Sequence, residues 1–165
     1  MKIRHFLLSV VVLVSFLAVG CTPARSTQDY LASGGRGEVA GKMNGVEFSA
    51  VIEISEGGEI FCIEYLSPSS LCGLVLEVRG ESCEVTLGEV NFVCDTAEVA
   101  GFLQPVSAFL PHGDAKTVQK EGENTVLTFS SGGMLTLSPK GEPLAFFGED
   151  IDVRVVWWER GESEE

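Results

Sequence analysis

Apolar and polar residues alternate along most of the chain from residue 37 onward, and this period of two predicts β-strands. The longest alternating run spans residues 46–54, where every second side chain is apolar. Asn44-Gly45 directly precedes it and is typical of a two-residue hairpin turn, because both residues tolerate a positive φ angle. A partner strand is therefore expected at 38–43, and further strands at 60–66, 72–79, 117–120, 125–130, 134–138, 144–147 and 151–158.

A second hairpin is predicted at residues 83–94, with its turn at Gly88-Glu89. Glycine at the first turn position suits a type II′ turn, which pairs Leu87 with Val90. Counting outward from the turn places six mostly apolar side chains on one face of this hairpin: Cys83, Val85, Leu87, Val90, Phe92 and Cys94.

One helix is predicted, at about residues 96–110. Asp95 followed by Glu98 resembles a capping box in which Asp replaces the usual Ser or Thr. Pro105 interrupts the helix, so we expect a kink or two short helices, the second starting at Pro105. Apolar residues at three- and four-residue spacing form a single stripe: Val99, Phe102, Leu103, Val106, Phe109 and Leu110.

These elements predict a mainly β (α+β) fold: a strongly curved antiparallel sheet or open barrel of eight to ten strands, covered by one kinked helix. A single domain is expected at residues 37–158. Residues 159–165 are expected to form a disordered acidic tail.

The start of the chain has the pattern of a secretory signal. Basic Lys2 and Arg4 precede an apolar run at 6–19, which is short for a stable membrane span. We expect a signal peptide at residues 1–20. Residues 21–36 are small, polar and rich in turn formers, which predicts a flexible tether.

The stretch Leu17-Ala18-Val19-Gly20-Cys21 resembles the lipobox of bacterial lipoproteins, with Ala18 where Leu is usual. The resemblance implies cleavage before Cys21 and a lipid anchor, with acyl chains such as palmitate, on that thiol. It also implies a location in the cell envelope, on the outer face of the cytoplasmic membrane or on the outer membrane. An ordinary cleaved signal and an uncleaved membrane helix are the alternatives.

Charge excludes one class of partner. Of the 11 Lys and Arg residues, Lys2 and Arg4 lie in the first 20 residues. The remaining nine stand against 24 Asp and Glu, so the chain after residue 20 has a net charge of −15. Phosphate backbones repel such a surface, so no nucleic-acid binding is expected. A cationic protein partner would be attracted to it.

Four cysteines remain beyond the anchor: Cys62, Cys72, Cys83 and Cys94. An even number in an exported domain predicts two disulfides, with three possible connectivities. The hairpin register favours Cys83–Cys94, which leaves Cys62–Cys72. Zinc is the alternative, but no two of these cysteines are close in sequence and the only histidine after the signal is His112.

The sequence predicts no catalytic residues, no metal site and no cofactor. It contains no Gly-x-Ser-x-Gly motif, and one histidine supplies no evident base for the serines. Acidic clusters such as Glu149-Asp150-x-Asp152 lack the spacing of a calcium loop. We therefore expect a protein that is not an enzyme.

Two strands, 60–66 and 151–158, carry apolar residues on both faces, which is typical of strands that line a ligand cavity. Alternation places Trp157 with Val153 and Val155 on one face and Trp158 on the other. The alternative is that the second face packs under the helix or a loop. The candidate ligand-lining residues are Phe61, Ile63, Tyr65, Phe102, Phe109, Trp157 and Trp158.

Three loose motifs resemble the lipoprotein-localisation (Lol) carriers: Gly45-x-x-Phe48-x-Ala50-x-Ile52, Tyr65-Leu-Ser-Pro68-x-x-Leu71-x-Gly73-Leu74, and Gly141-x-Pro143. The resemblance implies a curved sheet that holds acyl chains in its concave side. The chain departs from the family in lacking a long N-terminal helix and in its four further cysteines, so no functional residue is carried over. The function expected is a membrane-anchored, non-catalytic module that binds a lipid or acyl chain. Alternatives are capture of a cationic protein, as lysozyme inhibitors do, and an envelope scaffold component.

Overall fold

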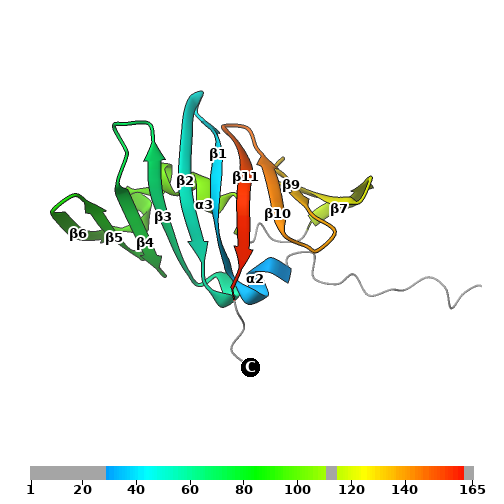
Figure 1. Cartoon of the computed structure of the whole chain (residues 1–165), viewed down its shortest axis with the longest axis horizontal. Coiled ribbons are helices and arrows are strands. Elements are labelled where there is room, and N and C mark those ends of the chain that lie inside the picture. Colours follow the sequence, from blue (N-terminus) through cyan, green and yellow to red (C-terminus); the bar gives the residue numbers. More distant parts are fainter. Residues whose placement is uncertain (1–28, 111–114, 162–165) are drawn as a thin grey trace, which may run out of the picture.

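The computed structural model of the chain describes residues 29–110 and 115–161. Within them, eleven strands form one antiparallel sheet in the order β6-β5-β4-β3-β2-β1-β11-β10-β9-β8-β7 (Figure 1). Neighbouring strands are mostly joined by hairpins, and β6 and β7 are the two open ends. The mainly β, antiparallel prediction is confirmed. The strand count is higher than the predicted eight to ten, and the sheet does not close.

The strands are β1 (Gly35–Met43), β2 (Val46–Ile54), β3 (Ile60–Ser67), β4 (Leu74–Arg79), β5 (Ser82–Leu87), β6 (Val90–Asp95), β7 (Ala115–Glu121), β8 (Asn124–Phe129), β9 (Met134–Leu137), β10 (Pro143–Phe147) and β11 (Ile151–Arg160). The helical elements are α2 (Asp29–Ser33), α3 (Ala100–Ser107) and the 3-10 turns η1 (Glu56–Gly58) and η2 (Thr96–Glu98).

Both predicted hairpin turns are present. Asn44 and Gly45 have φ angles of 51° and 78° between β1 and β2, and Gly88 has a φ of 61° between β5 and β6. Leu87 pairs with Val90, which confirms the register predicted from the sequence. These turns fix which side chains of each strand face the core.

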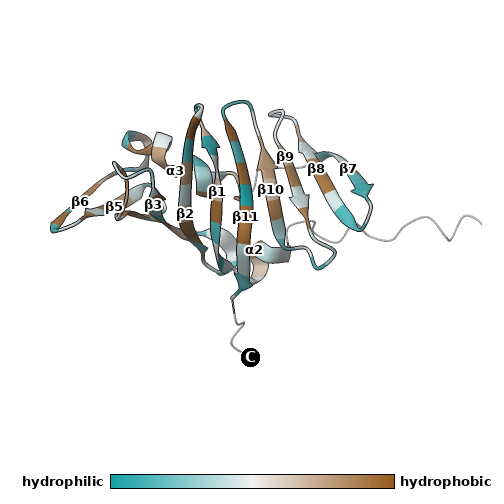
Figure 2. Cartoon of the chain, turned by 45° about the horizontal axis from the view of Figure 1, so that its top comes forward, coloured by the Kyte–Doolittle hydropathy of each residue, from teal (hydrophilic) through white to brown (hydrophobic). Residues whose placement is uncertain are grey.

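One face of the sheet carries the core, and we call it the inner face. On β2 the alternate residues Phe48, Ala50, Ile52 and Ile54 are buried there, while the other face, the outer face, is mostly polar at this strand. α3 lies against the inner face, behind the central strands in Figure 1. Figure 2 shows the corresponding alternation of hydrophobic and hydrophilic residues along these strands.

The predicted helix is shorter and broken at a different place. Instead of one helix at 96–110, η2 and α3 follow each other, with the break at Val99 rather than at Pro105. The Asp95 carboxylate accepts the N–H of Ala97 at 2.8 Å and thereby caps η2 alone. Pro105 is tolerated inside α3, where it removes one intrahelical bond, and the helix ends two residues later.

The domain also begins earlier than predicted, because α2 and the first residues of β1 belong to it. Tyr30 and Leu31, expected in the tether, are buried in the core. The Tyr30 ring packs edge-on against Trp158, with ring centroids 6.1 Å apart. A pair of apolar residues is too short to produce a periodic signal, which is why the sequence pattern missed α2.

The domain also ends later than predicted, because β11 continues to Arg160, two residues past the predicted boundary at 158. Cys21 and the predicted signal peptide lie outside the described residues.

A bulge in β11 reverses the predicted faces of its two tryptophans. The pairing with β1 shifts between Glu38 and Val39, which leaves Val156 without a partner. Trp158 therefore reaches the inner face with Val153, and Trp157 lies on the outer face, where its Nε1–H donates to Glu38 at 3.1 Å. A Cβ atom at Gly35 or Gly37 would lie 2.5 or 2.7 Å from the Trp158 ring, so these glycines make room for it.

Candidate functional site

α3 covers only the middle of the inner face. It contacts β1, β2, β3 and β11, and Leu103 and Val106 pack into the core from it. Phe109, which follows the helix, is completely buried. Leu103, Val106 and Phe109 thus fill the space between α3 and the central strands, while a pocket of about 300 Å³ remains beside α3, next to Gln104, Ala108 and Phe146.

Two tyrosines hold α3 in place. The Tyr65 hydroxyl donates to the carbonyl of Phe102 at 2.7 Å, and the Tyr30 hydroxyl donates to the carbonyl of Phe109. Burial raises the pKa of both tyrosines well above the ordinary value, so both hydroxyls stay protonated donors in alkaline solution as well as at neutral pH. The two bonds fix the chain at either end of its covering segment.

Beyond α3 the apolar inner face continues toward the open edge at β6. Ile63, Leu76, Val85 and Phe92 form one cross-strand row, in which exposure rises from 0% at Ile63 to 50% at Phe92. In the neighbouring row Leu87 is 47% exposed and Val90 is 61% exposed. We call Leu87, Val90 and Phe92 the inner flank. An exposed apolar surface continuous with a core is typical of a binding site.

The structure places most of the predicted ligand-lining residues in the core. Ile63, Tyr65 and Phe109 are fully buried, and Phe61 and Trp158 pack partly buried against the same core. Phe102 on α3 is 40% exposed, and Trp157 lies on the outer face. The five buried or partly buried side chains therefore pack in the core of the inner face, whereas Phe102 and Trp157 are partly exposed elsewhere.

The three residues of the inner flank were not among the candidates from the sequence. The pattern places them on the apolar face of the 83–94 hairpin, but it does not indicate that β6 is the end of the sheet. It also does not show that α3 stops short of β5 and β6. Both facts depend on tertiary packing.

Cys62, Cys72, Cys83 and Cys94 are free thiols in the structure. Cys62 faces Glu53 and Glu77 on the outer face, while Gly73 donates its N–H to Tyr65 and so places Cys72 beside the end of β3. Cys72 therefore lies about three strand residues, or roughly 10 Å, along β3 from Cys62. A disulfide spans a shorter distance, so the pair Cys62–Cys72 does not fit a bridge. Cys83 and Cys94 are directly opposed, as predicted.

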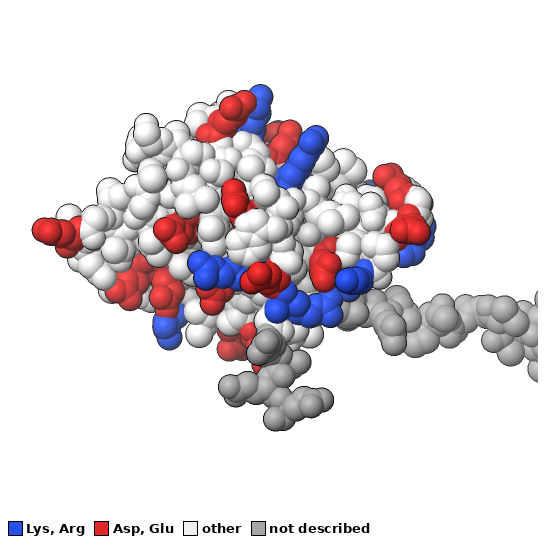
Figure 3. All heavy atoms as spheres, viewed as in Figure 1, with Lys and Arg blue, Asp and Glu red and all other residues white. Residues whose placement is uncertain are grey.

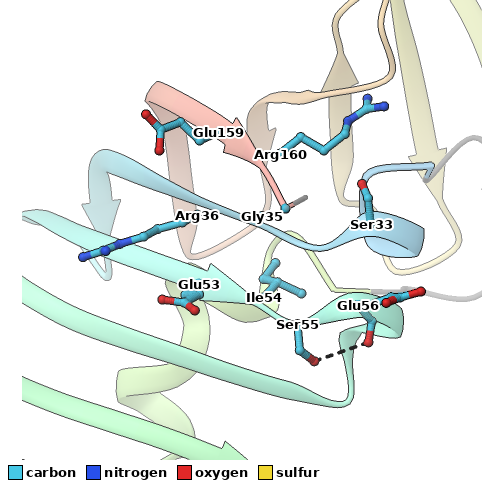
Figure 4. Close-up of a pocket in the computed structure, with 10 residues that line it drawn as sticks. Ser33, Gly35, Arg36, Glu53, Ile54, Ser55, Glu56, Glu159 and Arg160 are labelled. Atoms are coloured by element: carbon cyan, nitrogen blue, oxygen red, sulfur yellow. Dashed lines mark hydrogen bonds between the residues drawn. The ribbon is translucent and has the colours of Figure 1, made fainter. Parts of the chain in front are cut away.

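A pocket of about 430 Å³ lies where α2 meets the ends of β1, β2 and β11 (Figure 4). Arg36 stands between Glu53 and Glu159 in the strand register, and Arg160 donates to the carbonyl of Lys140 at 2.8 Å. Basic and acidic side chains thus alternate around this pocket, which favours neither an anion nor a cation.

A wider groove of about 700 Å³ crosses the outer face over β2, β1, β11 and β10. Phe147 and Val156 supply apolar surface there, next to Arg154 and Lys42. Lys42 forms an exposed ion pair with Glu47 at 3.7 Å, which contributes little to stability or affinity. This mixed lining is less apolar than the inner flank.

Among residues 29–110 and 115–161, no three His, Cys, Asp or Glu side chains are grouped so that they could hold a metal ion. In the same part of the chain, no helix is both long and apolar enough to cross a membrane. His112 lies outside the described residues.

The chain matches no known protein family and no curated protein. Among solved structures it is similar to an uncharacterized conserved protein from Thermus thermophilus, with 15% identity over 84% of this chain and 85% of that one, at a TM-score of 0.54. This likeness shows a shared fold.

Two further solved structures are more distant. The LolA superfamily protein NE2245 from Nitrosomonas europaea is matched with 12% identity over 88% of this chain and 80% of that one, at a TM-score of 0.37. PNGF-II is matched with 8% identity over 80% of this chain and 28% of that one, at a TM-score of 0.35. TM-scores this low do not show a shared fold, so the Lol-like fold stays a prediction from the sequence.

Proposed function

We propose that this protein is a membrane-anchored, exported binding module without catalytic activity, and that it holds an acyl chain or other lipid against the inner flank. The observation that carries the proposal is the half-exposed apolar surface of Leu87, Val90 and Phe92 beside a fully buried core. Each methylene group that such a surface removes from water contributes about 0.8 kcal/mol.

The ligand lies along the inner flank rather than beneath α3. Tyr65, Ile63 and Phe109 already fill the space under the helix, and two tyrosine hydroxyls hold its covering segment down. A flexible acyl chain can follow the two rows of side chains that run from the core to Val90 and Phe92.

The proposed attachment site of the membrane anchor is Cys21, directly after the predicted signal peptide. Two or more acyl chains on this residue hold a protein on a membrane stably. We expect intact-mass measurement of membrane-extracted protein to show a lipid adduct on Cys21 and Cys21→Ser to release the protein from the membrane. An unmodified, membrane-free parent protein would refute the anchor.

Binding of an acyl chain is tested in cells with a fatty acid that carries a diazirine group. Ultraviolet light should attach it to peptides that contain the inner flank. Peptide mapping separates these products from label that enters biosynthetically at Cys21, which forms without light.

Two matched variants sharpen this experiment. Phe92→Asn removes an inner-flank ring, whereas Val93→Asn changes the next residue of β6, which is 67% exposed on the outer face. We expect light-dependent labelling to fall for the first and to persist for the second. Equal labelling of both, or products that map away from β5 and β6, would contradict the proposed site.

A further inference from the structure

The outer edge of β6 carries backbone groups that no described strand pairs. The two-residue turn makes Leu87–Val90 a hydrogen-bonded pair, and these pairs alternate along an antiparallel hairpin. The N–H of Thr96 bonds to the carbonyl of Glu81 at 3.0 Å, which continues the same alternation. The N–H and C=O groups of Asn91, Val93 and Asp95 therefore point away from β5.

The two open ends of the sheet differ in how they are protected. β7 carries Lys116, Lys120 and Glu121 among its seven residues, and charges of this kind discourage the pairing of a further strand. β6 has one charged residue, Asp95, at its end, and its side chains are exposed on both faces. An apolar, unguarded edge of this kind is a template for strand addition.

Charge selects the partner of this edge. The stretch from Glu81 to Glu98 contains five acidic residues, and the sequence has no Lys or Arg between Arg79 and Lys116. The end of the molecule where β5 and β6 lie accordingly carries mainly acidic side chains (Figure 3). A second copy would bring the same carboxylates together, whereas a basic segment would neutralise them.

We propose that the edge of β6 binds an extended, basic segment of a partner protein by strand addition. The partner's backbone pairs with Asn91, Val93 and Asp95. Its apolar side chains continue the inner face beside Phe92, and its Lys or Arg side chains lie on the outer face near Asp95 and Glu84. Glu84 is already oriented there by a 2.7 Å hydrogen bond from the Asn91 amide. The inference goes beyond acyl binding and does not rest on it, because it uses the backbone edge.

The test is binding of a fluorescent peptide of alternating lysine and valine to the full chain in a mild non-ionic detergent. Val93→Pro removes an outward N–H without touching the bonds to β5, and Val93→Thr keeps that N–H as the matched control. We expect Val93→Pro to weaken binding about tenfold or more and Val93→Thr to leave it nearly unchanged. Amide exchange in the parent should slow at Asn91, Val93 and Asp95 when the peptide is added.

Several results would overturn the proposal. These are equal binding by Val93→Pro, equal binding of a peptide with the same residues in two blocks instead of alternation, and self-association of the chain through β6 at low salt. If Val93→Pro does not fold, exchange at the three amides decides alone: protection supports strand addition and its absence refutes it. Acyl labelling should persist in Val93→Pro, so failure of one proposal is distinguishable from failure of the other.

Discussion

Cys83 and Cys94 face each other across the β5–β6 hairpin, where a disulfide bond could join them. They form a hydrogen-bonded pair of the β5–β6 hairpin, and Cα atoms in such pairs lie about 5.5 Å apart, within the range that a disulfide spans. Cys83 is completely buried and Cys94 is partly buried against the same core. A bridge here would tie the edge strand β6 to the rest of the sheet.

We therefore predict that protein isolated from an oxidising compartment contains a Cys83–Cys94 disulfide. Peptide mapping without reduction should recover the two cysteines together, and Cys72 alone should react readily with a thiol reagent because it is exposed. Cys94→Ser should lower the free energy of unfolding by about 3 kcal/mol under oxidising conditions. Reduction of the parent should reproduce that loss, and a parent that is insensitive to reduction would contradict the bridge.

The reduced protein should lose stability at high pH. Burial, with a smaller effect of Cys94, raises the pKa of the Cys83 thiol from its ordinary 9.0 to about 11. The folded state thus keeps a proton that the unfolded state releases, so the stabilisation is complete below pH 9.0 and is lost as the pH rises through 11. Urea unfolding between these values should show a steeper decline for reduced than for oxidised protein. Cys62 is a free thiol in both the reduced and the oxidised protein, so its titration affects the two equally. An equal decline of stability with pH in both would therefore exclude a contribution from Cys83.

At the scale of elements, the strands and the position of α3 follow from local pattern, whereas α2 and the bulge in β11 do not. Period-two alternation and the turn residues Asn44-Gly45 and Gly88-Glu89 are local signals, so the sequence predicts both hairpins, and for the second it also predicts the register. α2 and the bulge at Val156 depend on distant partners: Tyr30 needs Trp158, and Trp158 needs the space above Gly35 and Gly37. Sequence periodicity carries no information about such pairs.

α2 is predicted to be an integral part of the domain. Tyr30→Phe removes only the hydrogen bond to Phe109 and should cost about 1 kcal/mol of stability. Tyr30→Ala also removes a fully buried ring and should cost about 3–5 kcal/mol. Chemical denaturation measures both, and unchanged stability of Tyr30→Ala would mean that the domain starts after α2.

At the scale of the whole molecule, the candidate site arises because a short helix covers a long sheet. α3 has eight residues, which can cover the central strands of the sheet but not all eleven. The sequence supplied the apolar face of the 83–94 hairpin, yet the exposure of Phe92 and Val90 follows from strand order and from where α3 ends. The apolar face of the candidate site could thus be predicted, but its place on the molecule could not.

The distribution of charge leads to a last prediction, on self-association. Carboxylates at β5 and β6 keep two copies apart at low salt, because the Debye length at about 0.01 M is some 30 Å. At about 1 M salt it falls to roughly 3 Å, so the apolar edges of two copies should then pair. Sedimentation velocity should show a monomer at low salt and association at high salt. Val93→Pro, which removes an outward N–H of the β6 edge whatever the salt concentration, should abolish the association, whereas Val93→Thr, which keeps that N–H, should not. A parent that stays monomeric at high salt would show that something other than charge separates the edges, and the charge argument for a basic partner would fail with it.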